Sequence, residues 1–129
     1  YMLSNKNVIN NVFKIKQPYN VNLAAEIAAI TTLNNKDKLI SNIEKILLEK
    51  KSLEEFINNH KKISSFKSEG NFVLCKFDNN DAEIVFNNLA KEGIFVRKFS
   101  DYLLKNYLRI SIGKLEQMNK LKNIINNSL

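Results

Sequence analysis

The spacing of the hydrophobic residues changes near residue 70, and this change limits the folds that the chain can adopt. Between residues 36 and 62, hydrophobic side chains recur at three- and four-residue intervals. That spacing predicts one long amphipathic helix with a single buried stripe, formed by Leu39, Ile43, Ile46, Leu47, Leu53, Phe56 and Ile57. After residue 70 the apolar runs are short or alternate with polar residues, as strands do.

Two shorter helices are expected before the long one. Residues 5–16 carry an uneven apolar face, and Pro18 should end this helix because proline disfavours helical geometry at the residue before it. Asn22 is placed to cap a second helix over residues 23–33.

The second half of the chain predicts a small sheet covered by helices. Three segments are typical of strands: residues 71–77, 94–99 and 107–112. Asn80, with Glu83 three residues later, predicts a capping box at the start of a helix that Gly93 ends. A last helix follows Gly113. This order indicates an α+β fold with a sheet of about three strands, of which the second and third pair antiparallel.

Composition excludes several classes of function. The net charge is +7 over 129 residues, but the lysines are scattered and no aromatic residues interleave with them, so a nucleic-acid partner is not expected. Cys75 lies in an apolar run and is predicted to be a buried free thiol. His60 is interpreted as a solvated helix residue, so neither a metal site nor a Ser-His-Asp arrangement is expected. With no membrane-spanning run or signal peptide, a cytoplasmic protein is expected.

Arg97 and Arg109 are the most informative residues, because they are the two arginines among twenty basic residues and both fall in predicted strands. A guanidinium binds a carboxylate or phosphate through two parallel hydrogen bonds, which lysine cannot do. Two interpretations remain open on the pattern alone. Each arginine pairs with a neighbouring acid on the polar face of a strand, or the two form a pocket for a small anionic substrate.

Four segments together resemble a known family. The run Asn106–Gly113 (NYLRISIG), preceded by Gly93–Ser100 (GIFVRKFS), is similar to the C-terminal signature of histidinol-phosphate aminotransferases. Lys16–Asn22 (KQPYNVN) resembles the loop that closes the large domain of these enzymes. Ser68–Val73 (SEGNFV) resembles the first strand of their small domain. Tyr1 resembles the tyrosine that follows an Arg-x-Gly motif.

The resemblance implies roles for five residues. Arg109 matches the arginine that binds the substrate α-carboxylate, and Arg97 matches an arginine that helps to hold the substrate phosphate. Asn71 matches a residue close to the carboxylate site. Tyr19 and Asn20 match a loop near the dimer interface and the active site. No catalytic residue is expected within these 129 residues.

The resemblance also implies an architecture and a reaction. Fold type I is expected, with residues 1–33 ending the large cofactor-binding domain and residues 34–129 forming the small domain. The whole enzyme is expected to be a homodimer that transfers an amino group from histidinol phosphate to 2-oxoglutarate, in histidine biosynthesis. A lysine of the large domain holds pyridoxal phosphate in this family. The chain lacks that lysine, so alone it is expected to be inactive and not to retain the cofactor. Residues 1–33 are also expected to expose apolar surface that the rest of the large domain would cover, which favours self-association.

The choice of substrate stays open on the sequence. The segment 101–105 is shorter than the loop of the family and lacks its Pro-Gly turn. A related aminotransferase for aromatic amino acids and a threonine-phosphate decarboxylase of the same fold are alternatives. A stand-alone binding or structural domain without catalytic activity is an alternative from another class.

Overall fold

The computed structural model describes residues 2–129, which form two compact units divided between Leu39 and Ile40. They are called here the N-terminal unit and the C-terminal unit. Tyr1 itself lies outside the described residues, and so does its predicted place after an Arg-x-Gly motif. The helix α3, Lys36–Asn58, begins in the first unit and continues in the second.

The N-terminal unit contains α1, Lys6–Ile15, and α2, Leu23–Asn34. The predicted cap at Asn22 is confirmed, because its side-chain oxygen accepts a hydrogen bond of 2.8 Å from the amide of Ala25. Asn5 caps α1 in the same way through the amide of Val8, at 3.0 Å. Neither helix buries a residue. Most apolar side chains of residues 2–33 are exposed, as predicted, although Ile9 and Val12 on α1 are half-buried.

The long helix differs from the prediction in two respects. It ends at Asn58 rather than Lys62, so His60 lies beyond the helix instead of within it. Only the last turns bury the predicted stripe: Leu53 and Ile57 are fully buried, whereas Leu39, Ile43 and Leu47 are exposed. The spacing of hydrophobic residues shows which face of a helix is apolar, but only a packed neighbour buries it, and the core reaches only this end of α3.

The sheet has four strands among the described residues rather than about three, in the order β1-β2-β4-β3, with every neighbouring pair antiparallel. They are β1, Ile63–Phe66; β2, Phe72–Phe77; β3, Arg97–Lys98; and β4, Tyr107–Ser111. The prediction missed β1 because its four residues follow a helical pattern without a break. The predicted antiparallel pairing of the strands around residues 97 and 109 is confirmed, although β3 is much shorter than 94–99.

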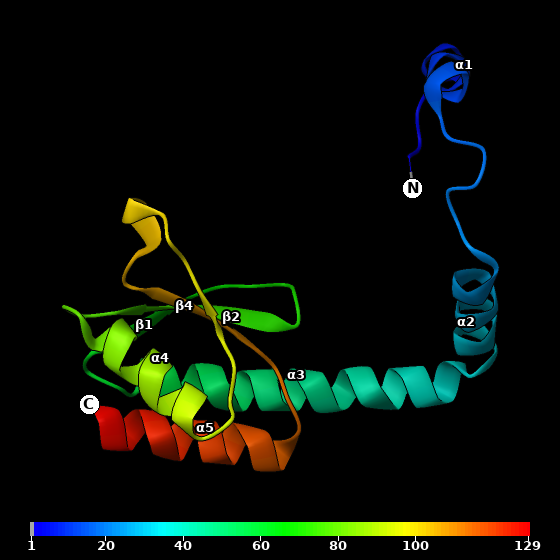
Figure 1. The fold of residues 1–129 in the computed structure, drawn as a ribbon. Helices are drawn as coiled ribbons and strands as arrows, with labels where there is room; N and C mark the ends of the chain where they lie inside the picture. Colours follow the sequence, from blue (N-terminus) through cyan, green and yellow to red (C-terminus); the bar gives the residue numbers. More distant parts are fainter. Residues whose placement is uncertain (1) are drawn as a thin grey trace. The chain divides into compact units, whose positions relative to one another are not determined.

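Two further helices cover one face of the sheet: α4, Asp81–Lys91, and α5, Leu115–Ser128 (Figure 1). They pack with the end of α3 around buried residues of the sheet, among them Val73, Cys75, Phe77, Leu108 and Ile110. The chain passes from β2 through α4 to β3 and then returns through the short 3₁₀ helix η1, Tyr102–Leu104, to β4. The α+β prediction is confirmed.

The ends of α4 test two predicted caps. Gly93 follows the helix with a φ of 76°, and its amide bonds to the Ala90 carbonyl at 3.0 Å, which confirms the predicted stop. The capping box at Asn80 is wrong, because the Asn80 side chain makes no cap hydrogen bond. The Glu83 carboxylate instead binds the ammonium of Lys98 on β3. The carboxylate that the capping box requires is therefore engaged in a tertiary ion pair.

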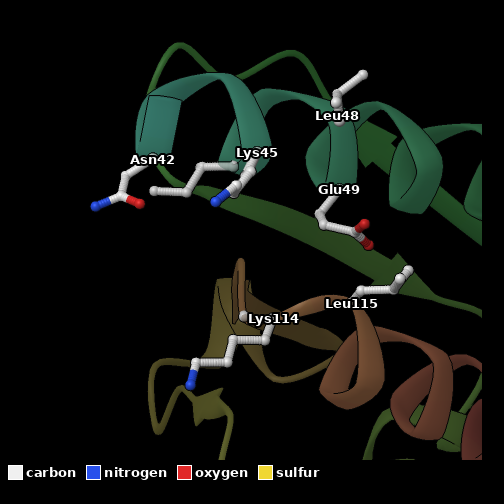
Figure 2. Close-up of a pocket in the computed structure, with 8 residues that line it drawn as sticks. Asn42, Lys45, Leu48, Glu49, Lys114 and Leu115 are labelled. Carbon is white, nitrogen blue, oxygen red and sulfur yellow. The ribbon is translucent and has the colours of Figure 1, made fainter. Parts of the chain in front are cut away.

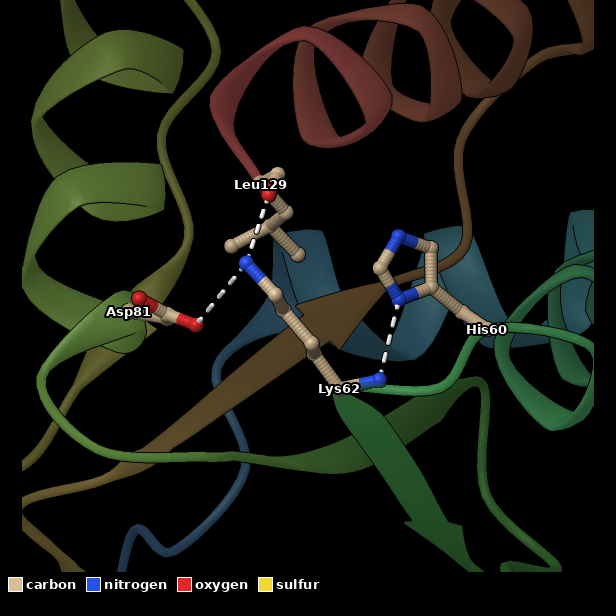
Figure 3. Close-up of polar contacts among 4 residues, drawn as sticks. All are labelled: His60, Lys62, Asp81 and Leu129. Atoms are coloured by element: carbon tan, nitrogen blue, oxygen red, sulfur yellow. Dashed lines mark hydrogen bonds and ion pairs between the residues drawn. The ribbon is translucent and has the colours of Figure 1, made fainter.

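Lys62 joins three segments that are distant in sequence. Its ammonium donates a hydrogen bond of 2.6 Å to the main-chain oxygen of Leu129, and it lies 4.0 Å from a carboxylate oxygen of Asp81 (Figure 3). The Lys62 amide also donates to Nδ1 of His60 at 3.3 Å. The start of β1, the start of α4 and the end of α5 are thereby held together, and His60 has a structural contact rather than a purely solvated setting.

Candidate functional site

The face of the sheet opposite the core is called here the open face. Side chains alternate along a strand, so the burial of Val73 and Cys75 turns their neighbours on β2 to the other side. On β4, burial of Leu108 and Ile110 does the same. The open face is lined by Phe66, Phe72, Leu74, Arg97, Tyr107 and Arg109, in registers fixed by the strand pairing.

Arg97 and Arg109 are Cα partners in the β3–β4 pair. Residues directly opposite each other in an antiparallel pair project from the same face, so the two guanidinium groups share the open face. Both side chains are exposed, and within residues 2–129 neither forms an ion pair. Separate structural ion pairs, one of the two interpretations left open by the sequence, are therefore not seen within residues 2–129.

One aromatic ring lies against Arg109, and an aromatic pair lies elsewhere on the same face. Its guanidinium carbon lies 5.3 Å from the centroid of the Phe72 ring, within the range of a cation–π contact. The rings of Phe66 and Tyr107 lie 6.0 Å apart between centroids, on the β1 side of the same face. Arg109 therefore has an apolar ring on one side and its like-charged partner Arg97 on the other.

Lys98, next to Arg97 in the sequence, lies on the opposite, helix-covered face of the sheet. Its partner is the buried Leu108, and its ammonium binds Glu83 of α4. The same ammonium lies 5.4 Å from the centroid of the Phe86 ring. Lys98 thus has an acidic partner on the helical side, whereas Arg97 has none on the open face within residues 2–129.

The other predicted site residues are not brought to the two arginines. Asn71 precedes β2, and its main-chain oxygen accepts a hydrogen bond of 2.9 Å from the Ile112 amide. In the alternation of β2 it has the parity of the buried Val73, not that of Phe72. Tyr19 and Asn20 are exposed in the loop between α1 and α2, in the N-terminal unit. Their roles stay predictions.

Phe72 was not predicted from the sequence to be part of the site. Its signal was present, since Phe72 and Leu74 alternate with the buried Val73 and Cys75 and so share a face with the strand partners of β4. Phe66 lies on the same face but contacts Tyr107 rather than either arginine, and it is not part of the site. Its place on this face could not be predicted, because the strand that carries it was not predicted.

A second feature, a cleft of about 700 Å³, lies between α3 and the start of α5 (Figure 2). Lys45 and Glu49 line it from α3, and Lys114 and Leu115 line it from the other side. One carboxylate oxygen of Glu49 is buried and has no hydrogen-bond partner within residues 2–129. None of the predicted site residues lines this cleft.

A metal-binding cluster and a membrane-crossing helix are both absent from the described residues. No group of three or more His, Cys, Asp and Glu side chains in residues 2–129 is placed to hold a metal ion. A membrane-crossing helix is likewise absent, because none of the helices in that range combines sufficient length with sufficient apolar character.

Solved structures share this arrangement of sheet and helices. The histidinol-phosphate aminotransferase from Clostridium acetobutylicum is 28% identical with a TM-score of 0.78, and the match covers 95% of this chain and 39% of that one. The L-threonine-O-3-phosphate decarboxylase from Porphyromonas gingivalis is 20% identical with a TM-score of 0.80, over 97% of this chain and 39% of that one. The fold is therefore that of the C-terminal part of fold type I enzymes.

Sequence comparison then gives the family. The family described as aminotransferase class I and II matches residues 1–125, and the chain belongs to this family. The histidinol-phosphate aminotransferase of Roseiflexus castenholzii is 34% identical over 128 residues, which are 97% of this chain and 34% of that protein. The family resemblance of the sequence is confirmed. The chain spans about a third of the length of the curated relatives that it matches.

Proposed function

We propose that this chain is the C-terminal, substrate-binding part of a pyridoxal-phosphate-dependent histidinol-phosphate aminotransferase. The observation that carries the proposal is the pair Arg97 and Arg109, which share the open face with no acid bound to either within residues 2–129. Two arginines paired across neighbouring strands fit a substrate with anionic oxygens, because each guanidinium offers two parallel donors. Similarity to histidinol-phosphate aminotransferases over nearly the whole chain supports the same reaction.

The two half-reactions bring different anions to this face. Glutamate and 2-oxoglutarate carry an α-carboxylate, whereas histidinol phosphate carries a phosphate monoester and no carboxylate. We assign the α-carboxylate to Arg109, which lies on β4 between two neighbouring strands and against Phe72. The phosphate is assigned to Arg97, on the edge strand β3. A charge-assisted hydrogen bond of this kind contributes about 1.5–3 kcal/mol.

What the chain supplies to the reaction is orientation. Transfer of the amino group requires the substrate to be held so that one bond at its α-carbon is aligned for cleavage, and a two-point clamp on the carboxylate fixes that geometry. A clamp built on paired strands holds its position better than one on a loop. Arg109→Lys therefore changes the geometry of binding even though the charge is kept.

The described residues do not fit pyridoxal phosphate. Within residues 2–129 the one buried lysine is Lys50, and its ammonium already donates a hydrogen bond to the main-chain oxygen of Ser68. Among the described strand residues, the open face also carries no acid that would pair with a pyridine nitrogen. When bound in such enzymes the cofactor serves as an electron sink for the substrate. We propose that other residues of the whole protein hold it.

The chain divides between two domains in this proposal. We assign residues 1–33 to the end of the cofactor-binding domain and residues 34–129 to the small domain, and the division of the structure between residues 39 and 40 supports this. A homodimer is part of the proposal, with Tyr19 and Asn20 near its interface. Their exposure in the loop after α1 is compatible with that role.

Steady-state kinetics of the whole protein tests the assignment of the arginines. Arg109→Lys should raise the KM for 2-oxoglutarate by about tenfold or more, since about 1.4 kcal/mol is a factor of ten. Arg97→Gln should raise mainly the KM for histidinol phosphate. The matched control is Lys98→Gln, on the same strand but the opposite face, which should change neither KM. Unchanged kinetics in both arginine variants would remove the proposed site.

A spectroscopic measurement tests whether residues outside this chain hold the cofactor. The chain alone, mixed with pyridoxal phosphate and dialysed, should show no cofactor absorbance band, whereas the whole protein should keep one. A stable band in the chain alone would show that residues 1–129 do hold the cofactor.

A decarboxylase acting on threonine phosphate is the second candidate, favoured by the structural similarity to the Porphyromonas gingivalis protein. Threonine phosphate carries a carboxylate and a phosphate in one molecule, so both arginines would bind at once. The whole protein incubated with threonine phosphate would then release carbon dioxide, and either arginine variant would raise the same KM. Amino transfer from histidinol phosphate without carbon dioxide release would exclude this candidate.

A further inference from the structure

We infer that Phe72 is a positioning residue for Arg109, and that Gly70 keeps open the space that the Phe72 ring needs. The inference rests on the proposed role of Arg109 in carboxylate binding. It adds a part of the site that is not itself in contact with the reacting atoms: a ring that restricts where the guanidinium can lie.

The geometry places the ring beside the guanidinium and on the correct face. Phe72 pairs with Ser111 on β4, and Arg109 pairs with Leu74, so Phe72 and Arg109 are diagonal neighbours on the open face. The Arg109 guanidinium carbon lies 5.3 Å from the ring centroid. Within residues 2–129 no hydrogen bond or ion pair of the Arg109 side chain accompanies this contact. The ring is therefore what restrains an otherwise mobile, four-bond side chain.

Gly70 is the residue that allows the ring to take this position. A Cβ built on Gly70 would lie 2.7 Å from Cε1 and 3.1 Å from Cδ1 of Phe72. The backbone of Gly70 does not have a positive φ, since Gly93 is the glycine with that conformation. Alanine would thus fit the backbone at position 70 but would force the Phe72 ring to move.

The turn that carries Gly70 is fixed from the helical side. The Gly70 amide donates a hydrogen bond of 3.2 Å to the Ser68 hydroxyl, and the main-chain oxygen of Ser68 accepts from the buried ammonium of Lys50. The place of Gly70, and with it the ring of Phe72, is therefore set by α3 rather than by the substrate. A clamp held in place before the substrate arrives loses less entropy on binding.

Three substitutions in the whole protein test this inference. Phe72→Leu removes the ring, Phe72→Tyr keeps it, and Gly70→Ala displaces it. Because an exposed cation–π contact is worth about a two- to fivefold change in binding, Phe72→Leu and Gly70→Ala should raise the KM for 2-oxoglutarate by about that factor. Phe72→Tyr keeps the ring and should therefore leave the KM for 2-oxoglutarate as it is in the unsubstituted protein. The kcat with saturating substrate should change less than the KM.

Phe66→Leu is the matched control. Phe66 is an aromatic residue on the same open face, but it contacts Tyr107 rather than Arg109. Its replacement should leave the KM for 2-oxoglutarate unchanged, and thermal unfolding should show that all four variants are folded. A purely structural role of Phe72 would lower the melting temperature and leave the KM of the folded enzyme as it was.

The outcomes separate the inference from the function on which it rests. If Arg109→Lys raises the KM for 2-oxoglutarate and Phe72→Leu does not, the carboxylate site stands and the positioning role is overturned. An unaffected KM in Arg109→Lys overturns the proposed site itself. If Phe72→Tyr raises the KM for 2-oxoglutarate as much as Phe72→Leu does, this also counts against the ring as the restraining group.

Discussion

Arg97 and Arg109 face each other directly across the β3–β4 pair, so two like charges occupy opposite positions in an antiparallel ladder. Like charges in such positions destabilise a sheet, by about 0.2–1 kcal/mol for pairs of this class. Both side chains are exposed, and solvent reduces the repulsion without removing it. The arrangement is unfavourable for folding and favourable for binding an anion.

The first prediction follows from that conflict. Arg97→Gln should raise the free energy of unfolding of the substrate-free whole protein by a few tenths of a kcal/mol, because it removes the repulsion with Arg109. Urea unfolding measures the change. Arg97→Lys keeps the charge and should leave the stability unchanged. Inorganic phosphate should stabilise the unsubstituted protein more than Arg97→Gln. A less stable Arg97→Gln would show that Arg97 has a stabilising partner instead.

Much of the fold could be predicted because local signals agreed with tertiary contacts. The loop after Pro18, the Asn22 cap and the Gly93 stop depend on backbone geometry that a few neighbouring residues determine. The strand β1 could not be predicted in this way. Its residues Ile63–Phe66 gain their strand conformation from pairing with β2, a contact that no local spacing encodes.

The candidate site shows the same division. The two arginines stood out by composition, and the strand alternation placed them correctly in strands. That they share a face depends on the register of β3 against β4, and a slip of one residue would have turned Lys98 to the open face in place of Arg97. The partner of Glu83 likewise depended on tertiary packing, which the apparent capping motif did not reveal.

The second prediction concerns pH and the Glu83–Lys98 pair. The side-chain hydrogen bond from Lys98 lowers the pKa of Glu83 below its ordinary value. A carboxylate whose folded pKa is lowered stabilises the protein above its unfolded pKa, and this contribution is lost as the pH falls through the folded value. Glu83→Gln should therefore be less stable than the unsubstituted protein at pH 7, with a difference that shrinks in acid.

Unfolding by urea at pH 7 and at pH 3 measures this difference. Glu44→Gln is the control, since Glu44 is an exposed residue of α3 with no ion pair within residues 2–129. It should show no comparable dependence on pH. A stability loss in Glu83→Gln that is the same at both pH values would mean that the carboxylate acts through packing and not through its charge.

The third prediction concerns Cys75, whose thiol is fully buried in the core. Burial raises the pKa of Cys75 from its ordinary value of 9.0 to about 12, so the thiolate fraction at pH 8 falls by about a thousandfold. A thiol reagent should label Cys75 at pH 8 only as fast as the protein unfolds. Ser64→Cys, exposed on the neighbouring strand, provides a thiol that should react at once. Rapid labelling of native Cys75 would contradict the burial.

The same thiol makes the protein less stable in alkali. Because the folded state holds its proton more tightly than the unfolded state, stability should fall as the pH rises from about 9 towards 12. Cys75→Ala should lack this part of the alkaline dependence, although it will be less stable at neutral pH because of the cavity that it leaves.

The fourth prediction separates two reasons for a glycine at the end of an element. Gly93 has a φ of 76°, and a Cβ there would meet no atom within 4 Å, so Gly93→Ala should cost about 1–2 kcal/mol through backbone strain alone. Gly93→Asn should cost less, because asparagine tolerates this conformation better. At Gly113 the φ is ordinary, but a Cβ would lie 2.7 Å from the Gln117 side-chain oxygen that accepts from the Lys114 amide. At position 93 the asparagine variant should therefore be more stable than the alanine variant, whereas at position 113 it should not. Equal losses of stability for alanine and asparagine at position 93 would show that backbone conformation is not the reason for glycine there.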